Sequence, residues 1–268
     1  MQGSFYVSVP TAFMYLYPDS KSEVTDELLY GTSVISVDES YSGYLFCKTD
    51  YGYTGYVDVS HLSPKKHKGE KYVVTSPFCD VYSIPEYRFS PIMTLPRGSI
   101  IEGEKKKCRD DRFMCVKSGE KEFFVPSYNT AESTALSRFD TSDKKRSQIV
   151  KTAFSYLGTP YRWGGKSTYG IDCSGFVFMS YTLCGLTLYR DAEFDRRYVT
   201  QIPFSALQPA DLVYYNGHVT MYIGDGEYIH SSATLGGVRI SSFNEEDDNF
   251  YPRLKTDIVK CARSLCLS

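Results

Sequence analysis

The sequence predicts two small all-β barrels followed by an α+β domain. Three observations support this organisation: a weak internal repeat in the first half, a change to helical periodicity after Ala131, and short strand-like runs near the C-terminus. With 268 residues, the chain is long enough for two or three small domains. We place the domains at residues 1–63, 64–129 and 130–268.

The repeat has a spacing of 67 residues that becomes 68 after one inserted residue in the second copy. Each copy alternates short runs of strand-forming residues with Gly, Pro, Asp and Ser. Two copies are too few to stack as a solenoid, so two separate barrels fit better. The repeated pairs include Val7 with Val74, Pro10 with Pro77, Gly31 with Gly98, and Cys47 with Cys115.

Both copies resemble bacterial SH3-like domains. The match is better in the first copy, where the segment 28–31 precedes a strand and the segment 50–57 ends the module. The second copy has lost most of the corresponding glycines in its segment 118–125. The polar segment 64–70 is the predicted joint between the two copies.

Composition and charge exclude several classes of protein. The net charge is −2 and the basic tracts are short, so we expect no nucleic-acid partner. No apolar run approaches the roughly 18 residues of a membrane span, and no signal peptide is visible at the start. The eight cysteines are too sparse for a disulfide scaffold and lack paired zinc spacing. We therefore expect a cytoplasmic monomer without cofactor or metal, the alternative being a secreted protein whose leader was removed.

The third segment begins with a predicted helix at 143–157, capped by Ser142 or Asp143. A second helix follows Cys173, and strands are predicted at 211–215, 218–223 and 227–231. Helices followed by strands favour an α+β domain. The apolar face of the first helix would comprise Ile149, Val150, Ala153, Phe154 and Leu157.

Cys173 is the candidate nucleophile because it stands at the first turn of the second predicted helix. The free N–H groups and the positive end of the helix dipole favour an anion there. Such a position can lower a cysteine pKa from about 8.5 to roughly 3.5–7.5, and the thiolate is the reactive form. With His218 and His230 downstream, the pattern indicates a cysteine hydrolase, in which His218 pairs with the thiol and His230 orients His218.

Hairpin register decides whether the two histidines cooperate. A three-residue loop at 224–226 pairs Ile223 with Glu227 and Thr220 with His230, which places His218 on the same face as His230. A two-residue loop would put His218 on the opposite face. The hydrolase hypothesis therefore predicts a three-residue or bulged turn.

Residue chemistry alone leaves other interpretations open. Cys173, His218 and His230 are also a possible metal-ligand set, although no fourth ligand is placed by the sequence. Asp172 either caps the helix or binds a substrate ammonium ion. Trp163 either forms an apolar wall of the site or packs beside the glycines that follow it.

Five motifs in order make the segment 140–261 closely resemble the NlpC-type cell-wall cysteine peptidases, which have a papain-like core. This resemblance implies that Cys173, His218 and His230 form a catalytic triad that hydrolyses peptidoglycan peptides. The motifs are GTPYRWGG (158–165), GIDCSGFV (170–177), LQPADLV (207–213), HVTMYIG (218–224) and YIHS (228–231).

The two preceding modules make the chain similar to γ-D-glutamyl-L-diamino acid endopeptidases that recycle muropeptides. That resemblance implies cleavage between γ-D-glutamate and a diamino acid in peptides with a free N-terminal L-alanine. The alternatives are a secreted hydrolase of intact wall, an inactive peptidoglycan-binding protein, and a transferase. The residues that would contact the substrate are Tyr161, Trp163, Asp172 and Ser174, joined by Glu23 and Tyr56 of the first module.

Overall fold

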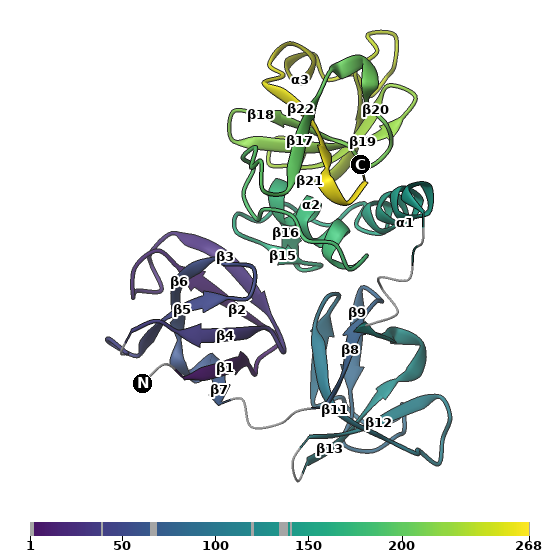
Figure 1. Cartoon of the computed structure of the whole chain (residues 1–268). Coiled ribbons are helices and arrows are strands. Elements are labelled where there is room, and N and C mark those ends of the chain that lie inside the picture. The colour runs from purple at the N-terminus through teal and green to yellow at the C-terminus, as the bar shows by residue number, and fades with distance from the viewer. Residues whose placement is uncertain are drawn as a thin grey trace. The chain divides into compact units, whose positions relative to one another are not determined.

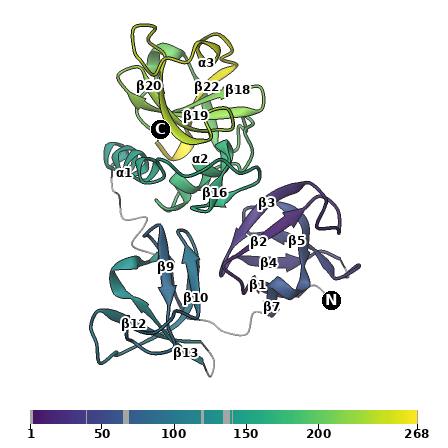
Figure 2. The same ribbon diagram turned by 180° about the vertical axis from the view of Figure 1, so that it is seen from behind.

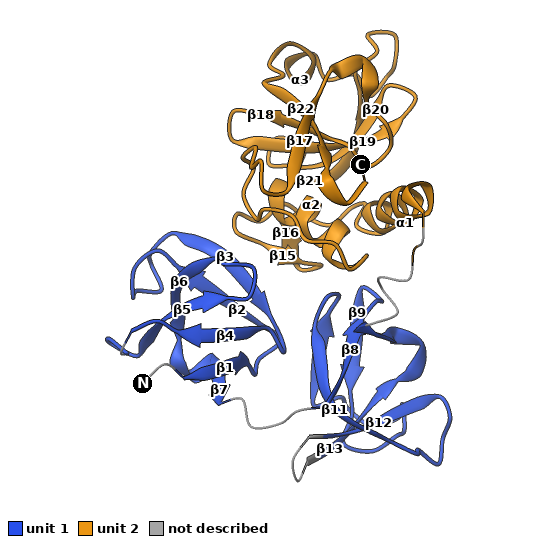
Figure 3. Cartoon of the chain, viewed as in Figure 1, with its two compact units in different colours: residues 1–135 blue, residues 136–268 orange. Residues whose placement is uncertain are grey.

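A computed structural model describes residues 3–38, 40–64, 69–118, 121–133, 139 and 141–267. The chain divides into two compact units, residues 1–135 and 136–268 (Figure 3). Most of the predicted joint at 64–70 lies outside the described residues, because 65–68 are not among them. Within the described residues, no helix is both long and apolar enough to cross a membrane.

The first module of unit 1 is one antiparallel sheet in the order β3-β2-β6-β5-β4-β1-β7 (Figure 1). Alternate residues of its strands point inward, so that Ala12, Met14, Leu45 and Val57 are buried in one core. Its strands are β1 (Ser4–Val7), β2 (Thr11–Tyr15), β3 (Val24–Leu29), β4 (Ser33–Ser36), β5 (Tyr44–Thr49), β6 (Thr54–Asp58) and β7 (Leu62–Pro64), with a 3₁₀ turn at Val59–His61.

The second module has its own sheets and its own core. One sheet has the order β13-β12-β11-β8-β14, and β9 pairs with β10 in a separate ladder. The core includes Val74, Leu95, Ile101 and Val116. Its strands are β8 (Glu70–Val74), β9 (Phe78–Val81), β10 (Met93–Pro96), β11 (Ile100–Lys106), β12 (Phe113–Ser118), β13 (Lys121–Pro126) and β14 (Thr130–Glu132), with a 3₁₀ turn at Ser127–Asn129.

The predicted barrels are not closed among the described strands. In the first module β3 pairs only with β2, and β7, which has three residues, pairs only with β1. The two edge strands therefore do not meet to complete a ring of hydrogen bonds. The first module is therefore an open sheet, and the second consists of two separate ladders around one core.

The internal repeat is confirmed by equivalent backbone hydrogen bonds. Gly31 N–H donates to the carbonyl of Val7 at 2.9 Å, and Gly98 N–H donates to that of Val74 at 2.9 Å. Both glycines have positive φ, 80° and 90°, a conformation that side chains disfavour. Each glycine thus ties the turn after one strand to the first strand of its module.

Unit 2 contains a six-stranded antiparallel sheet in the order β17-β22-β18-β19-β20-β21. Helix α2 packs against β19 and β20, and α1 packs against α2, as Figures 1 and 2 show. The elements are α1 (Ser142–Phe154), β15 (Lys166–Ser167), β16 (Gly170–Ile171), α2 (Cys173–Thr182), β17 (Val199–Ile202), β18 (Leu212–Tyr215), β19 (His218–Gly224), β20 (Glu227–Ser232), β21 (Gly237–Ser242), α3 (Pro252–Thr256) and β22 (Lys260–Ser264), with 3₁₀ turns at Phe204–Ala206 and Leu265–Leu267.

Helix α1 differs from its prediction at both ends. Thr141 is the N-cap, because its side chain accepts a hydrogen bond from Lys144 N–H, and the helix stops at Phe154. Ile149 is buried as predicted, whereas Phe154 is 39% exposed. The reason is geometric: Phe154 stands five residues after Ile149, about 140° around the helix.

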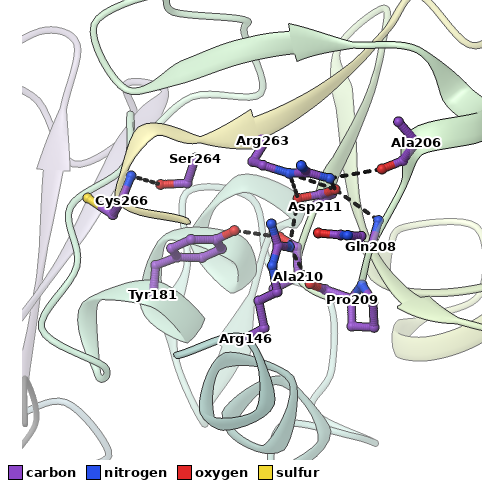
Figure 4. Close-up of polar contacts among 10 residues, drawn as sticks. All are labelled: Arg146, Tyr181, Ala206, Gln208, Pro209, Ala210, Asp211, Arg263, Ser264 and Cys266. Atoms are coloured by element: carbon purple, nitrogen blue, oxygen red, sulfur yellow. Dashed lines mark hydrogen bonds and ion pairs between the residues drawn. The ribbon is translucent and has the colours of Figure 1, made fainter. Parts of the chain in front are cut away.

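A buried carboxylate fixes the start of β18. Asp211 is fully buried and binds two guanidinium groups, Arg146 Nη1 at 2.8 Å and Arg263 Nη2 at 2.8 Å (Figure 4). Gln208 N–H donates a further hydrogen bond of 2.9 Å to Asp211. Two cations and one N–H compensate the loss of water around this charge. The network ties β18, and with it the neighbouring strand β19, to α1 and β22.

Candidate active site

The thiol of Cys173 stands at the first turn of α2, as the sequence predicts. Asp172 is the N-cap, and its Oδ1 accepts a hydrogen bond of 2.5 Å from Gly175 N–H. Nearly all of α2 is buried, which explains why its sequence is apolar on every side. A Cβ atom at Gly175 would lie 2.2 Å from the carbonyl oxygen of Gly165, so the close approach of α2 to the 161–165 turn requires glycine there.

Arg190 holds the two residues that flank Cys173, and sequence reasoning missed it. Its guanidinium donates to Asp172 Oδ1 and Oδ2, both at 3.1 Å, and to Ser174 Oγ at 2.9 Å. It also donates to the carbonyl of Gly164 at 3.0 Å. Arg190 is buried, so these bonds replace its water shell. No local pattern links Arg190 to Asp172, because 18 residues separate them.

The histidines lie on a hairpin with a bulged turn. Asp225 and Gly226 form a two-residue loop with φ of 52° and 80°, and Gly224 pairs with Glu227. The next pair along the ladder is Tyr222 with Tyr228, so Ile223 is an extra residue in β19. The prediction of a bulged turn is confirmed, but the pairing of Ile223 with Glu227 is wrong, because the bulge sits in the strand and not in the loop.

This register brings the two imidazoles into contact. His218 Nε2 lies 2.9 Å from His230 Nδ1, and His230 Nε2 lies 3.3 Å from Ser241 Oγ on β21. His230 is fully buried and Ser241 nearly so. If His218 Nδ1 faces a proton donor, His218 donates from Nε2 to His230, and His230 donates to Ser241. Ser241 is a second residue that the sequence analysis missed.

Burial dominates the protonation of the site. It lowers the pKa of His218 to about 4, and burial together with the His218 charge lowers the pKa of His230 to about 3. Burial, with the Asp172 charge, raises the pKa of Cys173 to about 11. The expected depressed thiol pKa is therefore wrong for the free protein, because the loss of water outweighs the helix dipole. At neutral pH the thiol and both imidazoles are uncharged.

Cys173, His218, His230 and Tyr161 line one pocket of about 500 Å³. A further group of lining residues comes from α3 and its flanks and was not singled out from the sequence: Tyr251, Arg253, Leu254, Thr256, Asp257 and Ile258. Asp172 and Ser174 are buried beneath Cys173 and are not among the lining residues, and Trp163, which is 61% exposed, is also outside the lining. The structure therefore brings together four of the predicted residues of unit 2.

Glu23 and Tyr56 belong to unit 1. Tyr56 lies on β6 and its ring contacts Phe46 with centroids 4.9 Å apart. Glu23 directly precedes β3, and its carbonyl accepts a hydrogen bond from Leu16 N–H at 2.9 Å. Among the described residues, no cluster of three or more His, Cys, Asp or Glu side chains is arranged to hold a metal ion.

Comparisons with known proteins identify the family. Residues 158–251 match the sequence pattern of the NlpC/P60 family. Dipeptidyl-peptidase 6 of Lysinibacillus sphaericus is 31% identical over 257 residues, covering 92% of this chain and 94% of that protein. The chain belongs to the NlpC/P60 family.

Other members of the NlpC/P60 family match in fold or over the catalytic segment. The crystal structure of an NlpC/P60 family protein from Bacillus cereus superposes with a TM-score of 0.81 at 21% identity, covering 98% of this chain and 99% of that one. A γ-D-glutamyl-L-lysine dipeptidyl-peptidase of Bacillus cereus is 36% identical over 104 residues, which are 36% of this chain and 31% of that protein. This chain is thus a cysteine peptidase. Its C-terminal unit has the NlpC/P60 fold.

Proposed function

We propose that this chain is a cysteine endopeptidase that hydrolyses peptidoglycan-derived peptides between γ-D-glutamate and the diamino acid. One observation carries the proposal: Cys173, at the start of α2, opens into the pocket that contains the hydrogen-bonded pair His218 and His230. The names of the relatives from Lysinibacillus and Bacillus support peptide cleavage of this kind.

In the proposed mechanism His218 takes the thiol proton as the sulfur attacks the amide carbonyl. His218 Nε2 is bonded to His230, so Nδ1 is the nitrogen left to take the thiol proton. The raised pKa of Cys173 and the lowered pKa of His218 mean that proton transfer accompanies attack rather than preceding it. His218 then protonates the leaving amine, and water hydrolyses the thioester. Backbone N–H groups at the start of α2 stabilise the oxyanion.

His230 takes the orienting role in this triad. Its contact with Ser241 Oγ allows the tautomer in which Nδ1 accepts from His218, because the hydroxyl can accept the proton on Nε2. A neutral imidazole steadies the imidazolium of His218 less than a carboxylate would. Burial of His230 compensates in part, since hydrogen bonds are stronger where water is excluded.

We further propose that the substrate carries a free N-terminal L-alanine, whose ammonium ion is bound near Tyr161, Asp172 and Ser174. Arg190 and Gly175 hold the Asp172 carboxylate in one orientation, so an ammonium ion would have to share it with Arg190. Trp163 of the same unit is a further proposed substrate contact, and Glu23 and Tyr56 stay predictions from the sequence.

The two modules of unit 1 are proposed to be SH3-like domains, in the division 1–63, 64–129 and 130–268. Their repeated strand order and separate cores support this. We also propose that the enzyme acts on released peptides in the cytoplasm, as a monomer with no nucleic-acid or membrane partner. Action on intact wall outside the cell is the alternative.

Cleavage of defined peptides tests the proposal. We expect the tripeptide L-Ala-γ-D-Glu-diamino acid to be cut to L-Ala-γ-D-Glu and the free diamino acid, as detected by mass spectrometry. N-acetylation of the alanine should prevent cleavage, and purified sacculi should stay intact. Cys173→Ala should abolish turnover. Cys184→Ala is the control: it removes a different buried thiol, which contacts Thr152, and should retain turnover.

Two outcomes would contradict this assignment. Release of peptides from sacculi, with equal cleavage of acetylated and free tripeptides, would favour the wall hydrolase. Absence of turnover by the wild-type chain, together with tripeptide binding that Cys173→Ala does not change, would show an inactive binding protein. Transfer of the acyl group to an added amine would instead show a transferase.

A further inference from the structure

The active-site pocket has a charged wall that the proposed chemistry does not use. This wall, part of the lining that also includes Cys173 and His218, consists of Tyr251, Arg253, Leu254, Thr256, Asp257 and Ile258, which belong to the short helix α3 and its flanks. Leu254 anchors this helix by packing in one core with Tyr215, the residue that pairs with His218 across the sheet. The wall is therefore built onto the strands that carry the catalytic histidine.

Two opposite charges stand on this wall, one helical turn apart. Arg253 Nε lies 3.5 Å from Asp257 Oδ2, and the two side chains are 81% and 55% exposed. Thr256 Oγ donates a hydrogen bond of 3.0 Å to Asp257 Oδ1, and Asp257 N–H donates to the carbonyl of Arg253. The contact between the charges is long and open to solvent, so a ligand can compete for both groups at little cost.

The wall is connected through Leu254 and Tyr215 to His218, the residue that the leaving group must approach. His218 must reach the amine that departs, so this amine and its residue lie on the His218 side of the sulfur. The turn of Asn216 and Gly217, directly before His218, lines the pocket together with α3. Tyr161, by contrast, belongs to the segment before α2, which the proposed function assigns to the acyl part of the substrate.

We propose that Arg253 and Asp257 form a subsite for the diamino acid and select a side chain that ends in both a carboxylate and an ammonium ion. The guanidinium of Arg253 would bind the carboxylate, and the Asp257 carboxylate would bind the ammonium ion. Lysine offers only the ammonium ion and leaves Arg253 without its ligand. This inference rests on the proposed function, because it names the diamino acid that the enzyme prefers.

Kinetics with two matched tripeptides test the subsite. L-Ala-γ-D-Glu-meso-diaminopimelate and L-Ala-γ-D-Glu-L-Lys differ only in the terminal carboxylate of the side chain. We expect the wild-type kcat/KM to be about tenfold higher for the first peptide. Arg253→Gln should lower kcat/KM for the diaminopimelate peptide about fivefold, through KM, and change the lysine peptide less than about twofold. Asp257→Asn should lower kcat/KM for both peptides, since both carry the ammonium ion.

Lys255→Gln is the matched control, because Lys255 is a basic residue of the same helix that pairs with Glu245 and is not among the pocket residues. It should leave kcat/KM unchanged for both peptides.

Equal wild-type kcat/KM for the two peptides, or an equal loss of kcat/KM for both in Arg253→Gln, would overturn the subsite while leaving the proposed function intact. Failure of the wild-type enzyme to cut either peptide would instead overturn the proposed function, and the subsite with it. Circular dichroism of each variant verifies that α3 and the sheet are retained.

Discussion

His218 and His230 face the same side of their hairpin because Ile223 is an extra residue in the strand that carries His218. A strand side chain changes face with every one-residue shift of register. Without the bulge, the two-residue loop at Asp225 and Gly226 would place the imidazoles on opposite faces of the sheet. The 2.9 Å contact between them thus depends on one inserted residue near the turn of the hairpin.

Deletion of Ile223 should therefore abolish peptide cleavage while an insertion in the loop should not. The deletion shifts the register of His218 against His230, whereas a glycine inserted between Asp225 and Gly226 lengthens the loop and preserves the bulge. Tripeptide turnover measures the effect, and circular dichroism shows whether the sheet is kept. Full activity in the deletion variant would mean that the pairing of the two histidines is not needed.

Ser241→Ala should slow catalysis without weakening substrate binding. The hydroxyl partners His230 Nε2, and its loss frees His230 to adopt the other tautomer. We expect kcat to fall roughly two- to tenfold with KM unchanged, the range that one hydrogen bond contributes. Ser242→Ala is the control, since the Ser242 hydroxyl donates to Asp247 instead. A loss of the same size in both variants would point to a general loss of packing in β21.

Arg190→Gln should destabilise the fold and impair the nucleophile. It leaves Asp172 as a buried carboxylate without its cation, which costs about 3–5 kcal/mol of unfolding free energy. Adding Asp172→Asn should restore part of this stability, because the unpaired charge is then removed. Denaturant unfolding measures the free energy, and Arg197→Gln at an exposed ion pair should leave it unchanged. If Arg190→Gln had the same free energy of unfolding as the wild type, the role given to this ion pair would be wrong.

Stability should fall as the pH is lowered from about 6.5 toward 4. The folded pKa values of His218 and His230, about 4 and 3, lie below the value of 6.5 in an unfolded chain. Between these limits the unfolded chain binds more protons, so acid favours unfolding. The double variant His218→Gln/His230→Gln should lose less stability over this interval. If the free energy of unfolding depended on pH in the same way in the variant and the wild type, these histidines would not titrate as described.

The local features of the site were predictable from the sequence. One of the two roles predicted for Asp172, the cap of the helix that begins at Cys173, is present. Gly31 and Gly98, which the repeat pairs, make equivalent backbone hydrogen bonds in the structure. Each of these features depends on a few neighbouring residues, so the pattern carries enough information to identify it.

The partners of the buried charges could not be predicted in the same way. Asp211 binds Arg146 and Arg263, which stand 65 and 52 residues away. Nothing in the neighbourhood of an arginine or an aspartate identifies a partner at such a distance. The depressed thiol pKa expected from the helix start also failed, because the exposure of Cys173 depends on what the rest of unit 2 packs around it.

By itself, the sequence determined where the chain turns, where a thiol begins a helix and which two histidines share a hairpin, because steric limits and capping act over a few residues. Tertiary structure alone decided that Arg190 and Ser241 support the site, that residues of α3 line its pocket, and that the thiol is protonated at rest. These properties arise from burial and from contacts between distant segments, and both exist only once the sheet and helices have packed together.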